Sequence, residues 1–347
     1  HWRMTGNWLG AAALSLSIAG AAVAEPTYKL MTFSDLADWE NDDHQAALTT
    51  FVETCGDMDD PEWSGICQVA KTALDARAFF EAFFQPVMVE DGEPMLFTGY
   101  FEPELRGAPN RGGEFQHPIY RLPDDYVQGQ PYLTRREIEE MGALSGQGLE
   151  IAWLADPVDL FFLQVQGSGR IRFPDGGGIR VGYGGKNGQE YSSVGRELIA
   201  RGTYTEHQVS AQVIRNWVAD NPAEGKELLW VNKSYVFFRE VNEVPADKGP
   251  LGAMNRSITT GRSIAVDPAF TKLGTPIWIE KEGAAPIHRL MVAQDTGSAI
   301  KGAQRADIFF GTGDMAGRKA GQIKDGGRMI TLLPIQMAYA MLPETIE

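Results

Sequence analysis

The sequence predicts a mainly β protein with a helical N-terminal region. Glycine supplies 39 of the 347 residues without a collagen-like period, so most glycines are expected to mark tight turns between short strands. From residue 233 onward, short apolar runs alternate with Gly, Pro and Asp, a spacing typical of a barrel or a sandwich. These runs are KSYVFFREV, RSIAVD, TPIWIE, HRLMVAQD, ADIFFGTG and RMITLLP.

Residues 25–90 are expected to be mostly helical. An apolar i, i+3, i+4, i+7 pattern ends at Cys55, and a second helical pattern with paired phenylalanines follows Cys67. Eleven residues separate the two cysteines, and an oxidising compartment would let a disulfide join the helices. Two buried free thiols are the alternative. The spacing does not fit a zinc site.

The middle of the chain mixes strands and helices. Residues 95–105 alternate like a strand, and capping-box sequences predict helices that begin after Thr134 and Thr205. Between these helices, residues 159–188 contain two β-rich runs on either side of the turn sequence 174–178. This pattern predicts a β-hairpin.

The first 24 residues are expected to be a signal peptide. The apolar run 8–24 ends in Ala22-Val23-Ala24, an A-x-A cleavage signal, so cleavage is expected before Glu25. An uncleaved inner-membrane anchor is the alternative, because the segment before the run carries little positive charge. No cysteine follows the run to accept a lipid. We therefore expect a soluble periplasmic protein, with outer-membrane association left open.

Charge and motif content exclude several functions. The formal net charge of −15 argues against nucleic-acid binding and against docking on anionic lipid. The five histidines lack metal-ligand spacing, and neither a P-loop nor a G-x-S-x-G elbow is present. We therefore expect no metal and no cofactor, and carboxyl groups are the natural proton carriers.

Three aspartates in the C-terminal region are the acid–base candidates. Asp307 lies between apolar, strand-forming residues, so its carboxyl is expected at a partly dry surface. Desolvation would raise the pKa of this carboxyl toward the range that a general acid needs near neutral pH. Asp295 opens the segment Thr296-Gly297-Ser298 and Asp314 follows Gly313, and each of the three aspartates could instead be a turn former.

These aspartates and several earlier blocks resemble a known family. DTGSAIKG (295–302), ADIFFG (306–311) and Asp314 resemble the three-aspartate, or 3D, domain. The blocks TGYFEP, VQGSG, YGGKNG and NKSYVFF, between residues 98 and 238, resemble the rest of the membrane-bound lytic transglycosylase A (MltA) family. The resemblance extends from about residue 95 to residue 334.

The resemblance implies a fold and an activity. It implies a double-psi β-barrel domain from 25–104 plus 237–347, a second β-domain inserted at 105–236, and a groove between them. The implied partner is the glycan strand of peptidoglycan, bound by a monomer. The implied enzyme is an exotransglycosylase, a carbon–oxygen lyase. It would cleave the β-1,4 bond from N-acetylmuramic acid to N-acetylglucosamine without water and leave a 1,6-anhydromuramoyl end.

One carboxyl group can serve this chemistry. An ordinary glycosidase needs two carboxylates, but here the attacking group is the C6 hydroxyl of the sugar itself. Asp307 is assigned the dual role of general acid and then base. Asp295 would orient it or hold sugar hydroxyls, and Asp314 would position the loop.

Further residues are expected to contact the sugar. Those offering amide, hydroxyl, backbone or stacking contacts are Thr98, Tyr100, Gln166, Gly167, Ser168 and Gly169. Plain strand and hairpin residues are the alternative interpretation of the same set. Arg135-Arg136 is interpreted as a solvated helix face, and the segment 186–188 as a turn.

Two other functions fit the sequence. A non-catalytic, expansin-type module that binds glycan also uses a double-psi barrel with an acidic residue. A true muramidase would use Asp295 and Asp307 as an acid–base pair, with a carboxyl separation of about 6.5–9.5 Å if it inverts. The mass of the product distinguishes lysis from hydrolysis, because the two products differ by one water.

Overall fold

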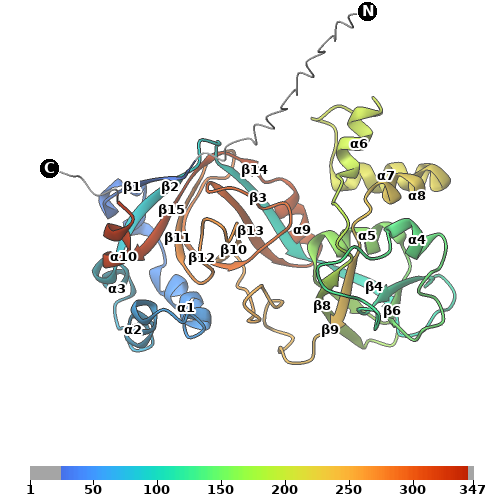
Figure 1. Cartoon of the computed structure of the whole chain (residues 1–347), viewed down its shortest axis with the longest axis horizontal. Helices are drawn as coiled ribbons and strands as arrows, with labels where there is room; N and C mark the ends of the chain where they lie inside the picture. The colour runs from blue at the N-terminus through green and yellow to red at the C-terminus, as the bar shows by residue number, and fades with distance from the viewer. Residues whose placement is uncertain (1–24, 343–347) are drawn as a thin grey trace, which may run out of the picture.

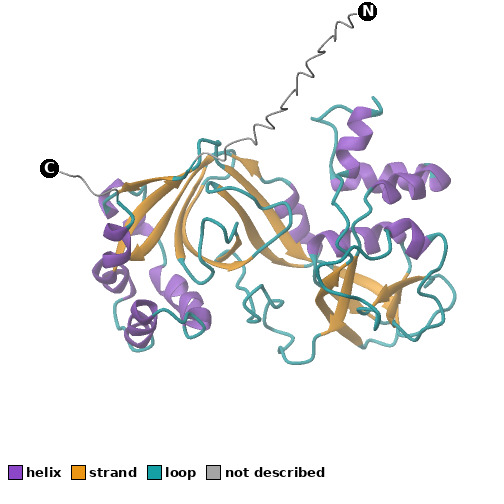
Figure 2. Ribbon diagram, viewed as in Figure 1, coloured by secondary structure: helices purple, strands orange, loops and turns teal. Residues whose placement is uncertain are grey.

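The computed structural model describes residues 25–342, so the expected signal peptide lies outside the described residues. The chain forms two lobes, each built on its own β-sheet (Figure 1). Helices lie beside both sheets, as Figure 2 shows by colour. The mainly β character expected from the sequence is confirmed. No helix within residues 25–342 is long and apolar enough to cross a membrane.

The first lobe contains a mixed, nine-stranded sheet in the order β1-β2-β15-β11-β12-β10-β13-β3-β14. Two of its pairings are parallel, β10 with β12 and β13 with β3, and the others are antiparallel. The strands expected after residue 233 are all present, five of them in this sheet and the first, β9 (Val236–Glu240), in the second sheet. The strands are β1 (Thr27–Leu30), β2 (Phe84–Glu90), β3 (Leu96–Glu102), β10 (Ser263–Ala265), β11 (Pro276–Lys281), β12 (Ile287–Asp295), β13 (Arg305–Thr312), β14 (Lys324–Asp325) and β15 (Gly327–Pro334).

Helices from the N-terminal region cover one face of this sheet. Trp39, Phe51 and Trp63 pack with Trp278 of β11 in one buried cluster. A disulfide between Cys55 and Cys67 joins the last residue of helix α1 (His44–Cys55) to helix α2 (Pro61–Ala70). The helical elements are η1 (Phe33–Asp35), η2 (Trp39–Asn41), α1 (His44–Cys55), α2 (Pro61–Ala70) and α3 (Ala76–Phe83), with α9 (Asp314–Gly321) and α10 (Ile335–Ala340) near the C-terminus.

The second lobe contains a six-stranded sheet in the order β5-β6-β4-β7-β8-β9. Its strands are β4 (Glu104–Ala108), β5 (His117–Tyr120), β6 (Glu150–Leu154), β7 (Gly169–Arg172), β8 (Gly178–Lys186) and β9 (Val236–Glu240). Its helices are α4 (Arg135–Glu139), α5 (Pro157–Gln166), α6 (Val194–Ala200), α7 (Ala211–Asp220) and α8 (Pro222–Val231).

Three expected elements differ in the structure. The expected strand at 159–166 is helix α5, because Asp156 caps its first turn, Pro157 occupies its first position and Gly167 (φ +84°) ends it. The expected helix after Thr205 is absent. Helix α7 begins later, where the Ser210 side chain accepts from the amide of Val213. The mostly helical region 25–90 also contributes strands β1 and β2.

A buried ion cluster joins the two lobes. Glu102, the last residue of β3, is fully buried and contacts Arg170 and Arg180 of the second sheet at 3.0 Å each. Both arginines also donate to the carbonyl of Lys248, in the segment that returns to the first sheet. Thr312 of β13 donates to the same carboxylate. The cluster therefore fixes the two lobes and the returning segment at one point.

Candidate active site

The candidate site begins at a parallel strand pair. In the register of β3 with β13, Thr98 lies opposite Asp307, although the two residues are 209 positions apart in sequence. Phe97 and Ile308, their neighbours along the strands, point into the core of the first lobe. The alternation of a β-strand therefore turns the Asp307 carboxyl to the other face, where it lines a cavity of about 710 Å³.

The surroundings of Asp307 favour a protonated carboxyl. Burial raises the pKa of Asp307 to about 6, while the hydrogen bond from Thr98 and the charge of Arg305 act in the opposite direction. The hydroxyl of Thr98 donates to Oδ1 of Asp307 at 2.8 Å. Arg305 donates to Thr98 Oγ1, also at 2.8 Å, and to two backbone carbonyls. The desolvation expected for Asp307 is thus present.

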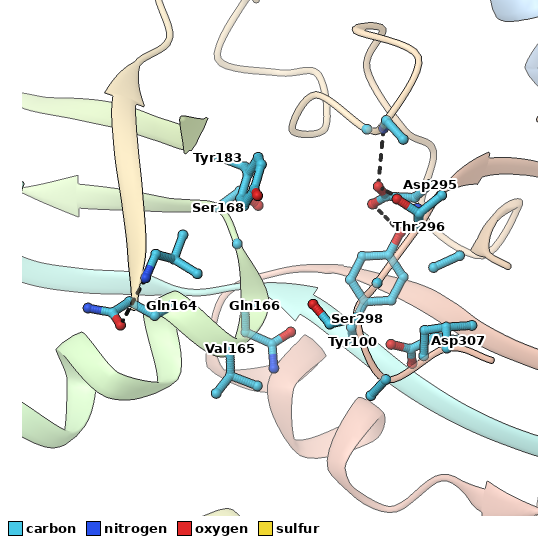
Figure 3. Close-up of a pocket in the computed structure, with 18 of the residues that line it drawn as sticks. Tyr100, Gln164, Val165, Gln166, Ser168, Tyr183, Asp295, Thr296, Ser298 and Asp307 are labelled. Atoms are coloured by element: carbon cyan, nitrogen blue, oxygen red, sulfur yellow. Dashed lines mark hydrogen bonds between the residues drawn. The ribbon is translucent and has the colours of Figure 1, made fainter. Parts of the chain in front are cut away.

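Asp295 forms a second carboxyl site at the end of β12. Its Oδ2 accepts from the hydroxyl of Tyr100 at 2.9 Å, and its Oδ1 accepts from the amides of Ala253 and Thr296. Burial raises the pKa of Asp295 to about 6, against the lowering effect of these donors. Burial and the two nearby aspartates raise the pKa of Tyr100 well above its usual value, so the phenol keeps its proton. Figure 3 shows Tyr100 between the two carboxyl groups.

The second lobe supplies the opposite wall. Helix α5 ends at this wall, and Gln166, Gly167 and Ser168 all line the cavity. The side-chain oxygen of Gln166 accepts from the amide of Phe101 on β3, which fixes the end of the helix against the first lobe. In Figure 3, Ser168 and Tyr183 lie across the cavity from Asp295. The expected sugar contacts at 166–168 therefore face the candidate acids.

Three of the expected site residues do not line the cavity. Thr98 lies beside Asp307 on the paired strand and is linked to the cavity by the hydrogen bond that its hydroxyl donates to the Asp307 carboxyl. Gly169 is buried as the first residue of β7, packed against Leu163. Asp314 is exposed at the start of α9, after the far end of β13. The structure thus brings together Asp295 and Asp307 but not Asp314.

Arg135 corrects one sequence interpretation. It was expected on a solvated helix face, yet its side chain is only 2% exposed and lies at the back of the cavity. Its guanidinium donates to Gln164 and to the carbonyls of Asn232 and Ser234. The capping box at Thr134 correctly predicted helix α4, but it carried no information on which face is buried.

The segment 186–188 is more than the expected turn. Lys186 is the last residue of β8 and lines the cavity. Asn187 is fully buried, and its side chain bonds the backbone of Leu133, Lys233 and Tyr235. Only Gly188, with φ +70°, has turn geometry. The sequence reasoning missed the cavity role of Tyr183, Lys186 and Arg239, although the first two belong to the YGGKNG block that carried the resemblance.

Among residues 25–342, no group of three or more His, Cys, Asp or Glu side chains could hold a metal ion. The functional groups that line the cavity are instead carboxyls, amides, hydroxyls and cationic side chains. Such a set can donate and accept protons and can bind a polar, hydroxyl-rich ligand.

Comparisons with known proteins match both lobes. The family model of the MltA specific insert domain matches residues 96–239, and that of the 3D domain matches residues 262–333. The membrane-bound lytic murein transglycosylase A of Vibrio cholerae is 37% identical over 267 residues, which cover 72% of this chain and 69% of that protein.

Solved structures are similar over most of the chain. The crystal structure of membrane-bound lytic murein transglycosylase from Agrobacterium tumefaciens superposes with a TM-score of 0.80 at 33% identity, covering 90% of this chain and 99% of that chain. Escherichia coli MltA with bound chitohexaose superposes with a TM-score of 0.70 at 31% identity, covering 84% and 89%.

Proposed function

Since the chain belongs to the membrane-bound lytic murein transglycosylase A (MltA) family, we propose that it cleaves peptidoglycan glycan strands without hydrolysis. The bond broken is the β-1,4 link from N-acetylmuramic acid to N-acetylglucosamine, and the product carries a 1,6-anhydromuramoyl end. The chitohexaose bound to the Escherichia coli relative supports a glycan ligand. A cavity of about 710 Å³ lined by hydroxyl and amide groups also suits a sugar chain.

Asp307 is the general acid in this proposal. The single observation that carries it is that Asp307, a cavity carboxyl whose pKa burial raises to about 6, accepts one hydrogen bond, from Thr98, whereas Asp295 accepts three. Such a group still holds a proton close to neutral pH and can give it to the glycosidic oxygen as the bond to C1 breaks. The hydroxyl of Thr98 holds one carboxyl oxygen, Oδ1, in a fixed orientation for this transfer.

The same carboxylate then acts as the base. It accepts the proton of the C6 hydroxyl while O6 attacks C1 and closes the anhydro ring, so Asp307 returns to its protonated state and no water is consumed. Because the nucleophile belongs to the substrate, its proximity to C1 lowers the barrier of this step. Asp295, held by Tyr100 and two backbone amides, lies in position to bind sugar hydroxyls. Asp314 has no direct part in this mechanism.

The proposal extends to domain organisation. We assign the catalytic domain to 25–104 plus 237–347, with a double-psi barrel topology, and the inserted domain to 105–236. The two separate sheets support a division near these bounds, because every strand of the second sheet lies within residues 104–240. Strand β9 (Val236–Glu240) belongs to the second sheet, so the sheets favour a second boundary about four residues later than residue 236. The periplasm is the compartment where such an enzyme meets its substrate, and the names of the relatives suggest membrane association.

The mass of the released muropeptides tests the proposal. Purified sacculi digested with the protein should yield anhydromuropeptides, each lighter by one water than the hydrolysed form. Products that carry the extra water would instead identify a muramidase, with Asp295 and Asp307 as the pair. Sacculi that are bound but not cleaved would identify the non-catalytic, expansin-type function.

A further inference from the structure

The cavity carries a charge opposite to that of the whole chain. Its charged lining consists of the acids Asp295 and Asp307 and of the cations Arg135, Lys186, Arg239 and Arg305. The chain as a whole has a formal net charge of −15. The pKa values of both acids are raised to about 6, which further reduces the negative charge of the cavity in mildly acidic solution. A cationic cavity in an acidic protein indicates recognition of an anionic ligand.

Three of these cations already have protein partners. Arg135 is buried, and its guanidinium is bonded to a glutamate, an amide and two carbonyls. Arg239 pairs with Glu243 at 2.7 Å. Arg305 donates to Thr98 and to backbone carbonyls, and its charge acts on Asp307. An incoming anion would have to replace a glutamate at Arg135 and Arg239, and several hydrogen bonds to Thr98 and to the backbone at Arg305.

Lys186 differs from the other three. Its Nζ donates to the hydroxyl of Ser298 at 3.3 Å, across the cavity from the second lobe to the first. None of the ion pairs formed within residues 25–342 includes Lys186. A neutral hydroxyl is a weak partner for an ammonium group, and a carboxylate can replace it with a charge-assisted hydrogen bond.

The backbone fixes Lys186 at this place. The pairing of β8 with β9 shifts register between Tyr183 and Gly185, and Gly185 has φ +144°. A side chain at Gly184 would meet the backbone of Phe238 at 2.9 Å, so only glycine allows this close approach. Directly after Lys186, the buried side chain of Asn187 fixes the chain by several hydrogen bonds. The bulge and the buried amide together hold Lys186 at the edge of the cavity.

We infer that Lys186 binds a carboxylate of the muramoyl residue, either on its lactyl group or on the peptide attached to that group. Lys186 would thereby make the groove prefer anionic peptidoglycan over neutral glycan. The inference rests on the proposed function. The carboxylate has two sources. Strands that keep their peptides carry it on the peptide, whereas strands stripped by an amidase carry it on the lactyl group itself. Chitohexaose has neither a lactyl group nor a peptide, so it carries no carboxylate and is the neutral probe.

Kinetic measurements on two variants test the inference. In Lys186→Met, KM should rise about 3- to 10-fold on carboxylate-bearing strands while kcat stays within about twofold, the range of a partly exposed ion pair. The dissociation constant for chitohexaose should stay unchanged. Lys186→Arg should keep the KM of the unmodified protein. Added salt should raise KM of the unmodified protein toward that of Lys186→Met, because exposed charge pairs are screened.

Lys301→Met is the matched control. Lys301 is exposed and follows Ser298 in the first lobe, but it does not line the cavity. Lys301→Met changes the net charge by the same amount as Lys186→Met and should leave KM unchanged. An effect of Lys186→Met on only one kind of strand identifies the source of the carboxylate. An unchanged KM on both kinds, or equal weakening of chitohexaose, would overturn the inference. A failure of the proposed function would differ, since the unmodified protein would then release no anhydromuropeptides.

Discussion

Asp307 and Glu102 lie on paired strands, β13 and β3, yet their carboxyl groups have different surroundings. In both cases a threonine on the opposite strand donates its hydroxyl, Thr98 to Asp307 at 2.8 Å and Thr312 to Glu102 at 2.9 Å. Glu102 also contacts two guanidinium groups directly. Near Asp307, the guanidinium of Arg305 bonds the threonine hydroxyl instead of the carboxylate.

This difference separates a structural carboxylate from a reactive one. The arginine contacts of Glu102 satisfy its charge and tie the lobes together. Asp307 has no arginine hydrogen bond and faces the cavity, so burial raises its pKa to about 6. Arg305 bonds the hydroxyl of Thr98 rather than Asp307, so no guanidinium hydrogen bond offsets the effect of burial on the pKa of Asp307.

The largest expected effect is on activity. Asp307→Asn should lower kcat on sacculi by about a thousandfold, because a general acid and base contributes about 10²–10⁴ to the rate. At neutral pH the melting temperature should be equal or higher, since the amide removes a charge that is costly to bury. A muropeptide assay and a thermal melt measure the two effects. Activity near that of the unmodified protein would assign the acid to another residue.

The next effect is on stability. Glu102→Gln should lower the free energy of unfolding by about 3–5 kcal/mol, because it leaves two guanidinium groups without their buried partner. Glu114→Gln is the matched control. It removes the acid of an ion pair with Arg106 that is about half exposed, and it should cost less than about 1 kcal/mol. Denaturant titration measures both, and equal losses would contradict the structural role of Glu102.

The smallest effect compares the two threonines. The hydrogen bond from Thr98 stabilises the charged form of Asp307 and lowers its pKa, so Thr98→Val should raise that pKa by about 0.5–1 unit. The general acid must be protonated, so kcat/KM of the unmodified protein should fall above about pH 6. In Thr98→Val this fall should begin at a higher pH.

Thr312→Val is the control for this shift. It removes the equivalent hydroxyl at Glu102, so it should reduce stability and leave the pH profile of kcat/KM in place. A profile that moves equally in both variants would show that the pH dependence reports the stability of the fold rather than the state of Asp307.

Local patterns predicted much of this structure. The strand spacing after residue 233 and the capping box at Thr134 predicted elements that the structure contains. The apolar residues of 159–166 favour a strand, but Asp156-Pro157 is a helix start signal and the structure contains helix α5 here. At Thr205 the backbone amide does donate to a side-chain partner, Oε1 of Gln208, but the helix starts only after Ser210.

The site was less predictable from the sequence than the strands. The apolar flanks of Asp307 indicated a desolvated carboxyl, and its raised pKa agrees with that reasoning. The burial of Arg135 and the bulge before Lys186 arise from contacts between segments far apart in the chain. No local pattern encodes such contacts, so a charged pair on a helix or a Lys-Asn-Gly segment looks the same whether it faces solvent or a cavity.

The strand register that pairs Thr98 with Asp307 has a consequence for how the protein acquires activity. The segment between Thr98 and Asp307 includes the whole second sheet, whose contacts are shorter in sequence and cost less entropy to close. A chain emerging during synthesis can therefore order its second lobe while its acid is still far from its hydrogen-bond donor. In the proposed function, the active site is therefore complete only when β13 pairs with β3, and a chain that ends before β13 lacks Asp307.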